Sequence, residues 1–118
     1  MFRPGTDERD VRYEDVLCDF CGRAWDPDDP ARPFIEGHHG SHLCGECLSI
    51  AYVAIVHEGR NDRAPGQTCT MCLEEREDET HRSEVRPAAT ICRRCVKQSA
   101  TALEKDPDSR WRRPAAPA

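Results

Sequence analysis

The sequence predicts a small α+β protein built from two similar halves, and two observations lead to that prediction. The first is a shortage of apolar residues: of 118 residues, 37% are hydrophobic and 33% are charged. A chain of this size and composition cannot bury enough apolar surface for two independent cores. The second is that all eight cysteines lie in four C-x-x-C pairs, namely Cys18/Cys21, Cys44/Cys47, Cys69/Cys72 and Cys92/Cys95.

The spacing of the cysteine pairs predicts two metal sites. The two sulfurs of one C-x-x-C turn can approach one ion, and two such turns complete a tetrahedral four-sulfur site. A structural zinc ion contributes roughly 10–16 kcal/mol in finger peptides, which would replace the missing core. We therefore predict two structural Zn²⁺ ions, one held by Cys18, Cys21, Cys44 and Cys47 and the other by Cys69, Cys72, Cys92 and Cys95.

A disulfide framework is the competing use of eight cysteines, and it is typical of short secreted chains. The first ten residues contain no apolar run of the kind found in a secretory signal. No run of 18 apolar residues, the length that would span a membrane, is present either. We therefore expect a cytoplasmic protein in a reducing compartment, where C-x-x-C pairs bind metal.

Composition divides the chain into five segments. A polar leader (1–16) precedes a first zinc module (17–58). A linker with the glycine, proline and asparagine residues of a loop (59–67) leads to a second zinc module (68–105). The tail (106–118) contains three prolines and several arginines, and we expect it to be disordered.

The two modules form an internal repeat. In each, a C-x-x-C pair is followed by about twenty polar residues and a second C-x-x-C pair, which leads directly into a helical segment. The helices are predicted over Glu46–Glu58 and Arg93–Lys105, closed by Gly59 and by Asp106-Pro107. Short hairpins are expected between the cysteine pairs, from 34–37 with 41–43 and from 85–86 with 90–91. Pro87 must then lie at the turn or the edge of the second hairpin.

A cysteine knuckle, a hairpin and a helix entered at the second cysteine pair together describe a treble-clef zinc finger. The N-terminus of a helix carries partial positive charge and free N–H groups, which suit thiolates. The sequence therefore predicts two tandem treble-clef fingers. The spacing also allows a cross-brace, in which the first and third cysteine pairs share one metal and the second and fourth share the other. Sequential pairing is favoured because it follows the repeat.

The first helix has an unusual composition, because no polar residue occurs from Ile50 to Val56. A helix on the surface of a small domain normally has a polar face. One face of this helix can pack on its own knuckle, while the face with Ile50, Val53, Ala54 and His57 needs another cover. We expect the two modules to pack around this helix as an intramolecular pseudo-dimer. A homodimer through this helix, or a protein partner, is the alternative cover.

Three motifs of the first module carry a resemblance to a known family. They are Cys18-Asp19-Phe20-Cys21-Gly22-Arg23, Phe34-Ile35-Glu36-Gly37 and Leu43-Cys44-Gly45-Glu46-Cys47-Leu48. With the apolar helix through Ile55-Val56, they resemble the C4 zinc-binding domain at the N-terminus of the ClpX unfoldase over about forty residues. The second module is a looser copy that lacks the knuckle glycine.

The resemblance implies a treble-clef module that dimerises and docks adaptors or substrates for a protease-associated ATPase. The chain has no G-x-x-x-x-G-K-[ST] phosphate loop and no room for an ATPase domain, so only the recruiting role carries over. The chain also resembles the McsA-type regulators, which are small bacterial proteins with paired C-x-x-C fingers that modulate a protein-modifying kinase. Both resemblances imply an interaction protein.

The charge of the chain favours a protein partner over nucleic acid. The formal net charge is −5, and two zinc ions in four-thiolate sites would bring it to about −9. Such a protein repels phosphate backbones. We therefore expect an adaptor or regulator. The alternative is a nucleic-acid-binding zinc-finger transcriptional regulator, for which the basic run Arg110 to Arg113 around Trp111 is the best footprint. Rubredoxin-like iron and electron transfer is a third possibility, although the helix at the second cysteine pair does not suit it.

Histidines and catalytic groups add little to this interpretation. His38, His39 and His42 precede Cys44, but four cysteines already complete the metal shell, so we expect these histidines in the hairpin and not as ligands. A four-cysteine zinc site has no open coordination position for a substrate. No nucleophile motif is present, and we expect the protein not to be an enzyme.

Overall fold

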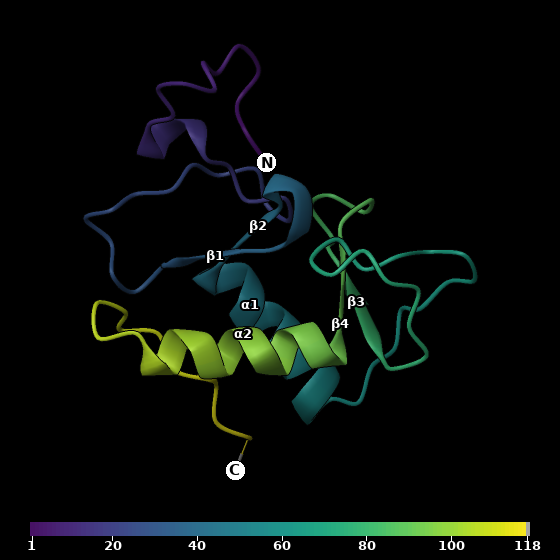
Figure 1. Ribbon diagram of the computed structural model, residues 1–118. Coiled ribbons are helices and arrows are strands. Elements are labelled where there is room, and N and C mark those ends of the chain that lie inside the picture. Colours follow the sequence, from purple (N-terminus) through teal and green to yellow (C-terminus); the bar gives the residue numbers. More distant parts are fainter. Residues whose placement is uncertain (118) are drawn as a thin grey trace.

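The computed structural model describes residues 1–117. The chain forms two antiparallel hairpins, each of which leads into a helix (Figure 1). The elements in chain order are η1 (Tyr13–Asp15), β1 (Phe34–Glu36), η2 (His38–Gly40), β2 (His42–Cys44), α1 (Gly45–Tyr52), η3 (Val53–His57), β3 (Thr80–Arg82), β4 (Thr90–Cys92) and α2 (Arg93–Lys105). The chain is therefore a small α+β protein, as its sequence predicts.

The two halves have the same register at the junction of hairpin and helix. In the first hairpin Phe34 lies opposite Cys44, and in the second Thr80 lies opposite Cys92. Each of these cysteines is the last residue of its strand, and the helix begins at the next residue. The hairpin therefore fixes the position of the first helical turn, where the second cysteine pair lies.

The helices agree closely with the sequence prediction. Helix α2 begins and ends at the predicted residues, Arg93 and Lys105. Helix α1 begins at Gly45, one residue earlier than predicted, and widens into the π-helical turn η3 before Glu58. The N–H of Glu58 donates to the carbonyl of Val53 at 2.9 Å, and Gly59 follows with a φ of +66°. Glycine adopts that angle without strain, so it ends the helix.

The second hairpin differs from the prediction. Its first strand is Thr80–Arg82, so the prediction that placed this strand at 85–86 is wrong. Val85 and Pro87 lie in the loop that connects β3 with β4. Pro87 has no N–H to contribute to a strand ladder, and pairing from Thr80 repeats the register of the first hairpin.

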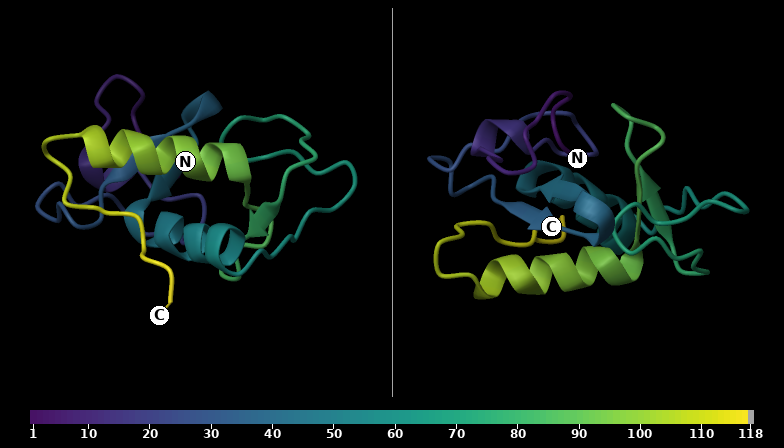
Figure 2. Two further views of the ribbon diagram at one scale, coloured as in Figure 1. Left: turned by 90° about the horizontal axis from the view of Figure 1, so that it is seen from below. Right: turned by 45° about the horizontal axis from the view of Figure 1, so that its top comes forward.

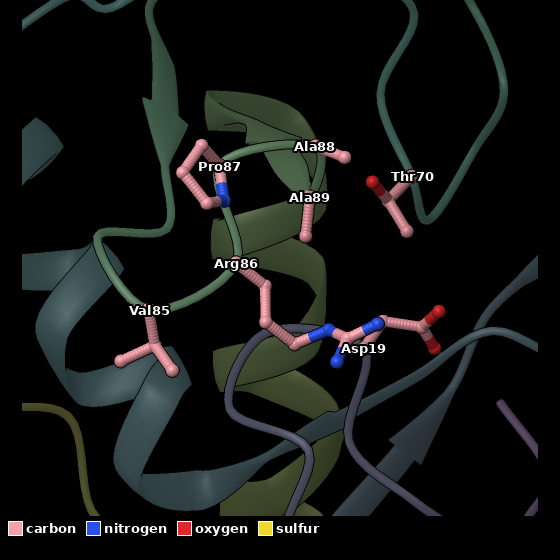
Figure 3. A pocket seen from close by; sticks show the side chains of 7 residues that line it. All are labelled: Asp19, Thr70, Val85, Arg86, Pro87, Ala88 and Ala89. Carbon is pink, nitrogen blue, oxygen red and sulfur yellow. The ribbon is translucent and has the colours of Figure 1, made fainter.

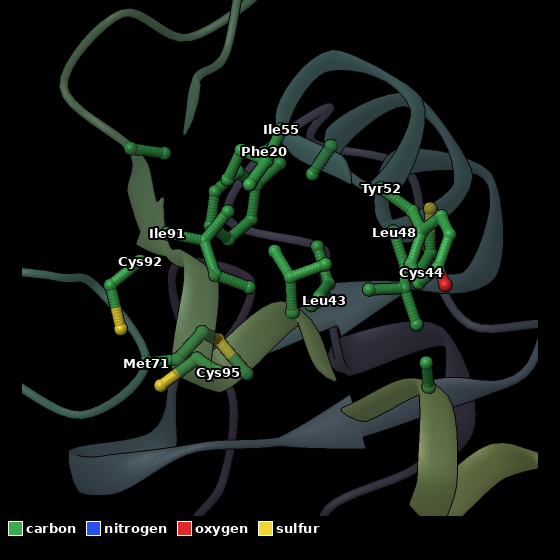
Figure 4. Close-up of a cluster of buried hydrophobic side chains, with 14 of the residues drawn as sticks. Phe20, Leu43, Cys44, Leu48, Tyr52, Ile55, Met71, Ile91, Cys92 and Cys95 are labelled. Carbon is green, nitrogen blue, oxygen red and sulfur yellow. The ribbon is translucent and has the colours of Figure 1, made fainter. Parts of the chain in front are cut away.

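One core serves both halves (Figure 4). Phe20, Leu43 and Leu48 come from the first half and Ile91 and Val96 from the second, and all five side chains are fully buried in the same cluster. Helix α1 packs against α2 (Figure 2). The two halves therefore contribute their few apolar residues to a single hydrophobic core.

The C-terminal segment packs on the helices, and the expectation of a disordered tail is wrong for residues 106–117. The chain turns back after α2 toward α1 (Figure 2). Trp111 is only 4% exposed, and its Nε1–H donates to the carbonyl of Gly45 and to Oγ of Ser49, both at 2.9 Å. Arg113 forms an ion pair with Glu104 at 2.6 Å. The indole covers the start of α1, which explains the order. Residue 118 of the predicted tail lies outside the described residues.

The predicted polar leader also lies against the first half. Phe2 forms an isolated β-bridge with Val16, which is buried. The N–H of Arg3 donates to the carbonyl of Asp15 at 2.8 Å. The leader is polar in sequence, but its few apolar residues tie it to the knuckle that follows.

Candidate metal centres

The first cluster contains the four cysteines of the first half. Cys18 and Cys21 come from the turn before the hairpin, Cys44 from the end of β2 and Cys47 from the first turn of α1. Their sulfur atoms all lie within 4.8 Å of one another, and those of Cys21 and Cys44 are 3.8 Å apart. In a tetrahedral site with Zn–S bonds of about 2.3 Å, neighbouring sulfurs are about 3.8 Å apart. The donor set therefore fits one zinc ion.

The second cluster repeats this arrangement in the second half. The sulfur atoms of Cys69, Cys72, Cys92 and Cys95 also lie within 4.8 Å of one another. Those of Cys72 and Cys92 are 4.0 Å apart. All eight cysteines are free thiols. The structure thus has the sequential arrangement of cysteine pairs and not the cross-brace.

Backbone N–H groups point at the first sulfur of each cluster. The N–H of Cys44 donates to Sγ of Cys18 at 3.3 Å, and the N–H of Phe20 donates to the same atom at 3.4 Å. In the second half, the N–H of Cys92 donates to Sγ of Cys69 at 3.4 Å. Hydrogen bonds to the charged form of a group favour that form. These hydrogen bonds therefore favour the thiolate form of the two sulfurs, which is the form that binds metal.

The sulfurs of a cluster lie close enough to oppose one another's ionisation. Hydrogen bonding to Cys44 and burial raise the pKa of Cys18 to about 12. Hydrogen bonding to Cys69 and burial raise the pKa of Cys92 to about 12. The pKa of Cys47 is raised as well, by hydrogen bonds to Cys18 and Cys44 and by burial. Without a cation the four thiols of a cluster cannot all ionise, whereas a bound divalent ion deprotonates its thiol ligands.

An ion pair joins the knuckle to the helix at each cluster, with opposite polarity in the two halves. Arg23 and Glu74 each lie two residues after the second knuckle cysteine. Glu46 and Arg94 each lie between the two cysteines at the start of the helix. Arg23 pairs with Glu46, and Glu74 pairs with Arg94. Sequence reasoning missed these pairs, although aligning the two halves on their cysteines would have found them.

The two knuckles share one backbone conformation but not one residue type. Gly22 has a φ of +78° and Leu73 a φ of +61°. Their N–H groups donate to the carbonyls of Cys18 and Cys69, both at 2.8 Å. A residue with a side chain is strained in this left-handed region by about 1–2 kcal/mol. The second knuckle therefore keeps the fold of the first at a cost that glycine would avoid.

Each half also contacts the other at the same position of its knuckle. The N–H of His38, in the loop of the first hairpin, donates to the carbonyl of Met71 at 2.9 Å. The Oγ of Ser83, in the loop of the second hairpin, donates to the carbonyl of Phe20 at 2.5 Å. Met71 and Phe20 both lie two residues after the first cysteine of their knuckle. Each hairpin loop thus caps the knuckle of the other half.

A shallow pocket of about 400 Å³ lies where the two knuckles face each other (Figure 3). Asp19 and Thr70, which follow the first cysteine of each knuckle, both line it. The loop that contains Val85 and Arg86 closes it. Asp19 is already engaged, because its carboxylate accepts a hydrogen bond from the N–H of His42 at 2.7 Å.

The histidines do not join the clusters. His38 and His39 are exposed, and His42 is 7% exposed. Within residues 1–117 the groups of side chains able to hold a metal consist of cysteines alone. Burial lowers the pKa of His42, so its ring is held neutral in the hairpin, where it packs edge-on against Phe2 at 5.5 Å.

No protein-family model, no curated protein and no solved structure matches the chain. Within residues 1–117, no helix has the length and apolar character needed to cross a membrane.

Proposed function

We propose that the chain is a non-enzymatic, cytoplasmic two-zinc module that recognises other proteins, acting as an adaptor or regulator. The observation that carries this proposal is the pair of four-cysteine clusters, each with a complete tetrahedral donor set. Such sites are closed to a substrate and serve to hold a fold together. The metal ions therefore stabilise the fold, and recognition is carried out by the protein surface that this fold presents.

The same proposal extends to the architecture. We infer that each half is a treble-clef finger and that the two halves form an intramolecular pseudo-dimer. The hydrogen bonds from His38 to Met71 and from Ser83 to Phe20 support this inference, because in each half the hairpin loop donates to the same knuckle position of the other half. The shared core supports it as well. In this arrangement α2 covers part of the apolar helix α1 and leaves Ile50 exposed.

The form of recognition that we propose is the recruiting role implied by the resemblance to the ClpX-type zinc-binding domain. In that role the chain would bring a partner or substrate to an ATPase-linked protease, or regulate a partner enzyme. The net charge of −5 disfavours the nucleic-acid alternative. Two contacts of the basic run Arg110 to Arg113 also disfavour nucleic-acid binding. Trp111 is buried, so its ring cannot stack on a base, and Arg113 is paired with Glu104.

Affinity purification of the tagged, zinc-loaded chain from a lysate of its source, with and without nuclease, tests the proposal. We expect a nuclease-resistant partner from a protease, ATPase or kinase system that also binds the purified chain. Recovery that nuclease abolishes would favour the nucleic-acid alternative and contradict the proposal. Metal analysis of the same protein should give two zinc ions per chain, and the red colour of iron–sulfur coordination would contradict the zinc assignment.

A further inference from the structure

A groove of about 380 Å³ lies beside the first cysteine cluster, at the junction of the two halves. Its lining includes Phe20 of the first knuckle, Ile50 of α1 and Val85 of the β3–β4 loop. Ile50 is 59% exposed and Val85 is 70% exposed. Val85 and Arg86 leave the loop in different directions, and Val85 lies on the side near α1 (Figure 3). The groove thus presents two large aliphatic side chains to solvent.

A corresponding groove in the other half has different chemistry. It lies between the second knuckle, α2 and the loop of the first hairpin, with Met71 and Gln98 in its lining. Met71 holds the knuckle position of Phe20. Gln98 follows Cys95 by three residues, as Ile50 follows Cys47. A polar residue therefore suits this helix position, and the fold does not require an isoleucine there.

Exposed aliphatic side chains are costly in a chain that has so little apolar material for its core. Large apolar residues gathered at the edge of a groove commonly mark a binding site. Ile50 and Val85 contribute little to the core, and the helix position of Ile50 accepts a polar residue in the other half, so their exposure indicates a ligand. The contrast with Gln98 shows that one groove has this property and its counterpart does not.

The charges around the groove indicate the chemistry of that ligand. Glu84 is exposed and takes part in none of the ion pairs formed within residues 1–117. Glu46 also borders the groove, but its charge is balanced by Arg23. The chain as a whole carries −5. A second copy of the chain would be repelled by its like net charge, whereas a basic segment would be attracted to the carboxylate of Glu84.

We propose that this groove binds an extended peptide segment of a partner protein. An aliphatic side chain of the segment inserts between Ile50 and Val85, and a neighbouring lysine or arginine pairs with Glu84. The inference rests on the proposed function of protein recognition and assigns the surface and the partner's chemistry.

Selection from a displayed library of random dodecapeptides on the zinc-loaded chain tests the groove. We expect the enriched peptides to share an aliphatic residue beside lysine or arginine. In fluorescence polarisation, these peptides should bind the Ile50→Gln variant on the order of tenfold more weakly, because burying an aliphatic side chain contributes that much. Glu84→Gln should weaken binding and reduce its salt dependence. Gln98→Ala is the matched control in the other groove and should leave binding unchanged.

Ile50→Gln gives position 50 the residue of its counterpart, so the variant should keep its zinc content and its circular dichroism spectrum. Failure to enrich any peptide, or equal binding of the peptides to wild type and Ile50→Gln, would overturn the groove. Binding that survives Ile50→Gln would still leave the recognition function standing. Self-association of the wild type that Ile50→Gln abolishes would assign the groove to a second copy and likewise overturn the peptide proposal. Only the nuclease experiment on lysate bears on the recognition function itself.

Discussion

Replacement of Trp111 should destabilise the whole protein, although it lies in a segment whose composition predicts disorder. Its indole is 4% exposed and belongs to the same buried cluster as the core of both halves. Truncation of a buried tryptophan to alanine typically costs about 3–5 kcal/mol. Since small domains are stable by only about 5–15 kcal/mol, Trp111→Ala should remove a large part of the unfolding free energy.

Trp111→Phe separates the packing of the ring from its hydrogen bonds. Phenylalanine retains much of the apolar area but cannot donate to Gly45 and Ser49. We expect a loss of about 1 kcal/mol for the missing hydrogen bonds, plus a smaller packing loss. The acceptors are not left without a partner, because Oγ of Ser49 also donates to the carbonyl of Gly45 at 3.0 Å. The loss should therefore stay well below that of Trp111→Ala.

A double-mutant cycle with Gly45 shows whether the contact exists as described. A Cβ at Gly45 would lie 2.9 Å from Cδ1 of Trp111 and 3.0 Å from Cδ of Pro33. Gly45→Ala should therefore be destabilising in the wild type and less so beside Trp111→Ala. The coupling between the two changes should be about 1 kcal/mol, within the range for residues in contact.

Equilibrium unfolding in urea, followed by circular dichroism at a fixed free zinc concentration, measures all four proteins of the cycle. Free zinc must be held constant because metal binding adds to the apparent stability. A loss below about 1 kcal/mol for Trp111→Ala would mean that the segment does not dock. Additive effects of the two substitutions would refute the contact between Trp111 and the start of α1.

Three further predictions concern the knuckles, a buried histidine and the metal. Leu73→Gly should raise the unfolding free energy by up to about 1 kcal/mol, because relief of left-handed strain outweighs the added entropy of the unfolded chain. Gly22→Ala is the control in the other knuckle and should be destabilising. A stabilising effect of Gly22→Ala would contradict the argument. Burial lowers the pKa of His81, so the unfolded chain takes up a proton first and stability should fall as the pH drops through about 6.5. His81→Gln should flatten that slope between pH 8 and 6 at constant free zinc, and an unchanged slope would assign the dependence to other groups. Cys47→Ser should reduce bound zinc from two ions to one and lower helicity, so normal helicity in the presence of a chelator would disprove the dependence of the first half on metal.

The cysteine register is the part of this molecule that is most directly readable from its sequence. Cys18 and Cys21 must share one turn, and a helix must follow Cys44, because short-range spacing sets both. The register therefore predicted the membership of both clusters and the start of each helix to within a residue. The end of the helical segment formed by α1 and η3 was equally readable, since Gly59 closes it with a positive φ.

Features set by contacts between distant residues were not readable in the same way. The segment with Trp111 is rich in proline and arginine, and composition alone predicts disorder. Its order depends on the start of α1, which lies more than sixty residues earlier in the chain. The strand at Thr80 was missed for a related reason. The four residues before it are charged, and it forms a strand because it pairs with β4, where Thr80 lies opposite Cys92.

The sequence by itself determined the local chemistry: two four-cysteine donor sets, the helices that begin at them, and a net charge of −5. Spacing and composition act over a few residues, and these properties depend on nothing more distant. The tertiary structure alone decided how the halves meet, through His38 on Met71 and Ser83 on Phe20, and which apolar residues stay exposed. Ile50 belongs to an unbroken apolar run, yet it remains in solvent while Ala51 is buried, because tertiary packing covers only one side of the helix.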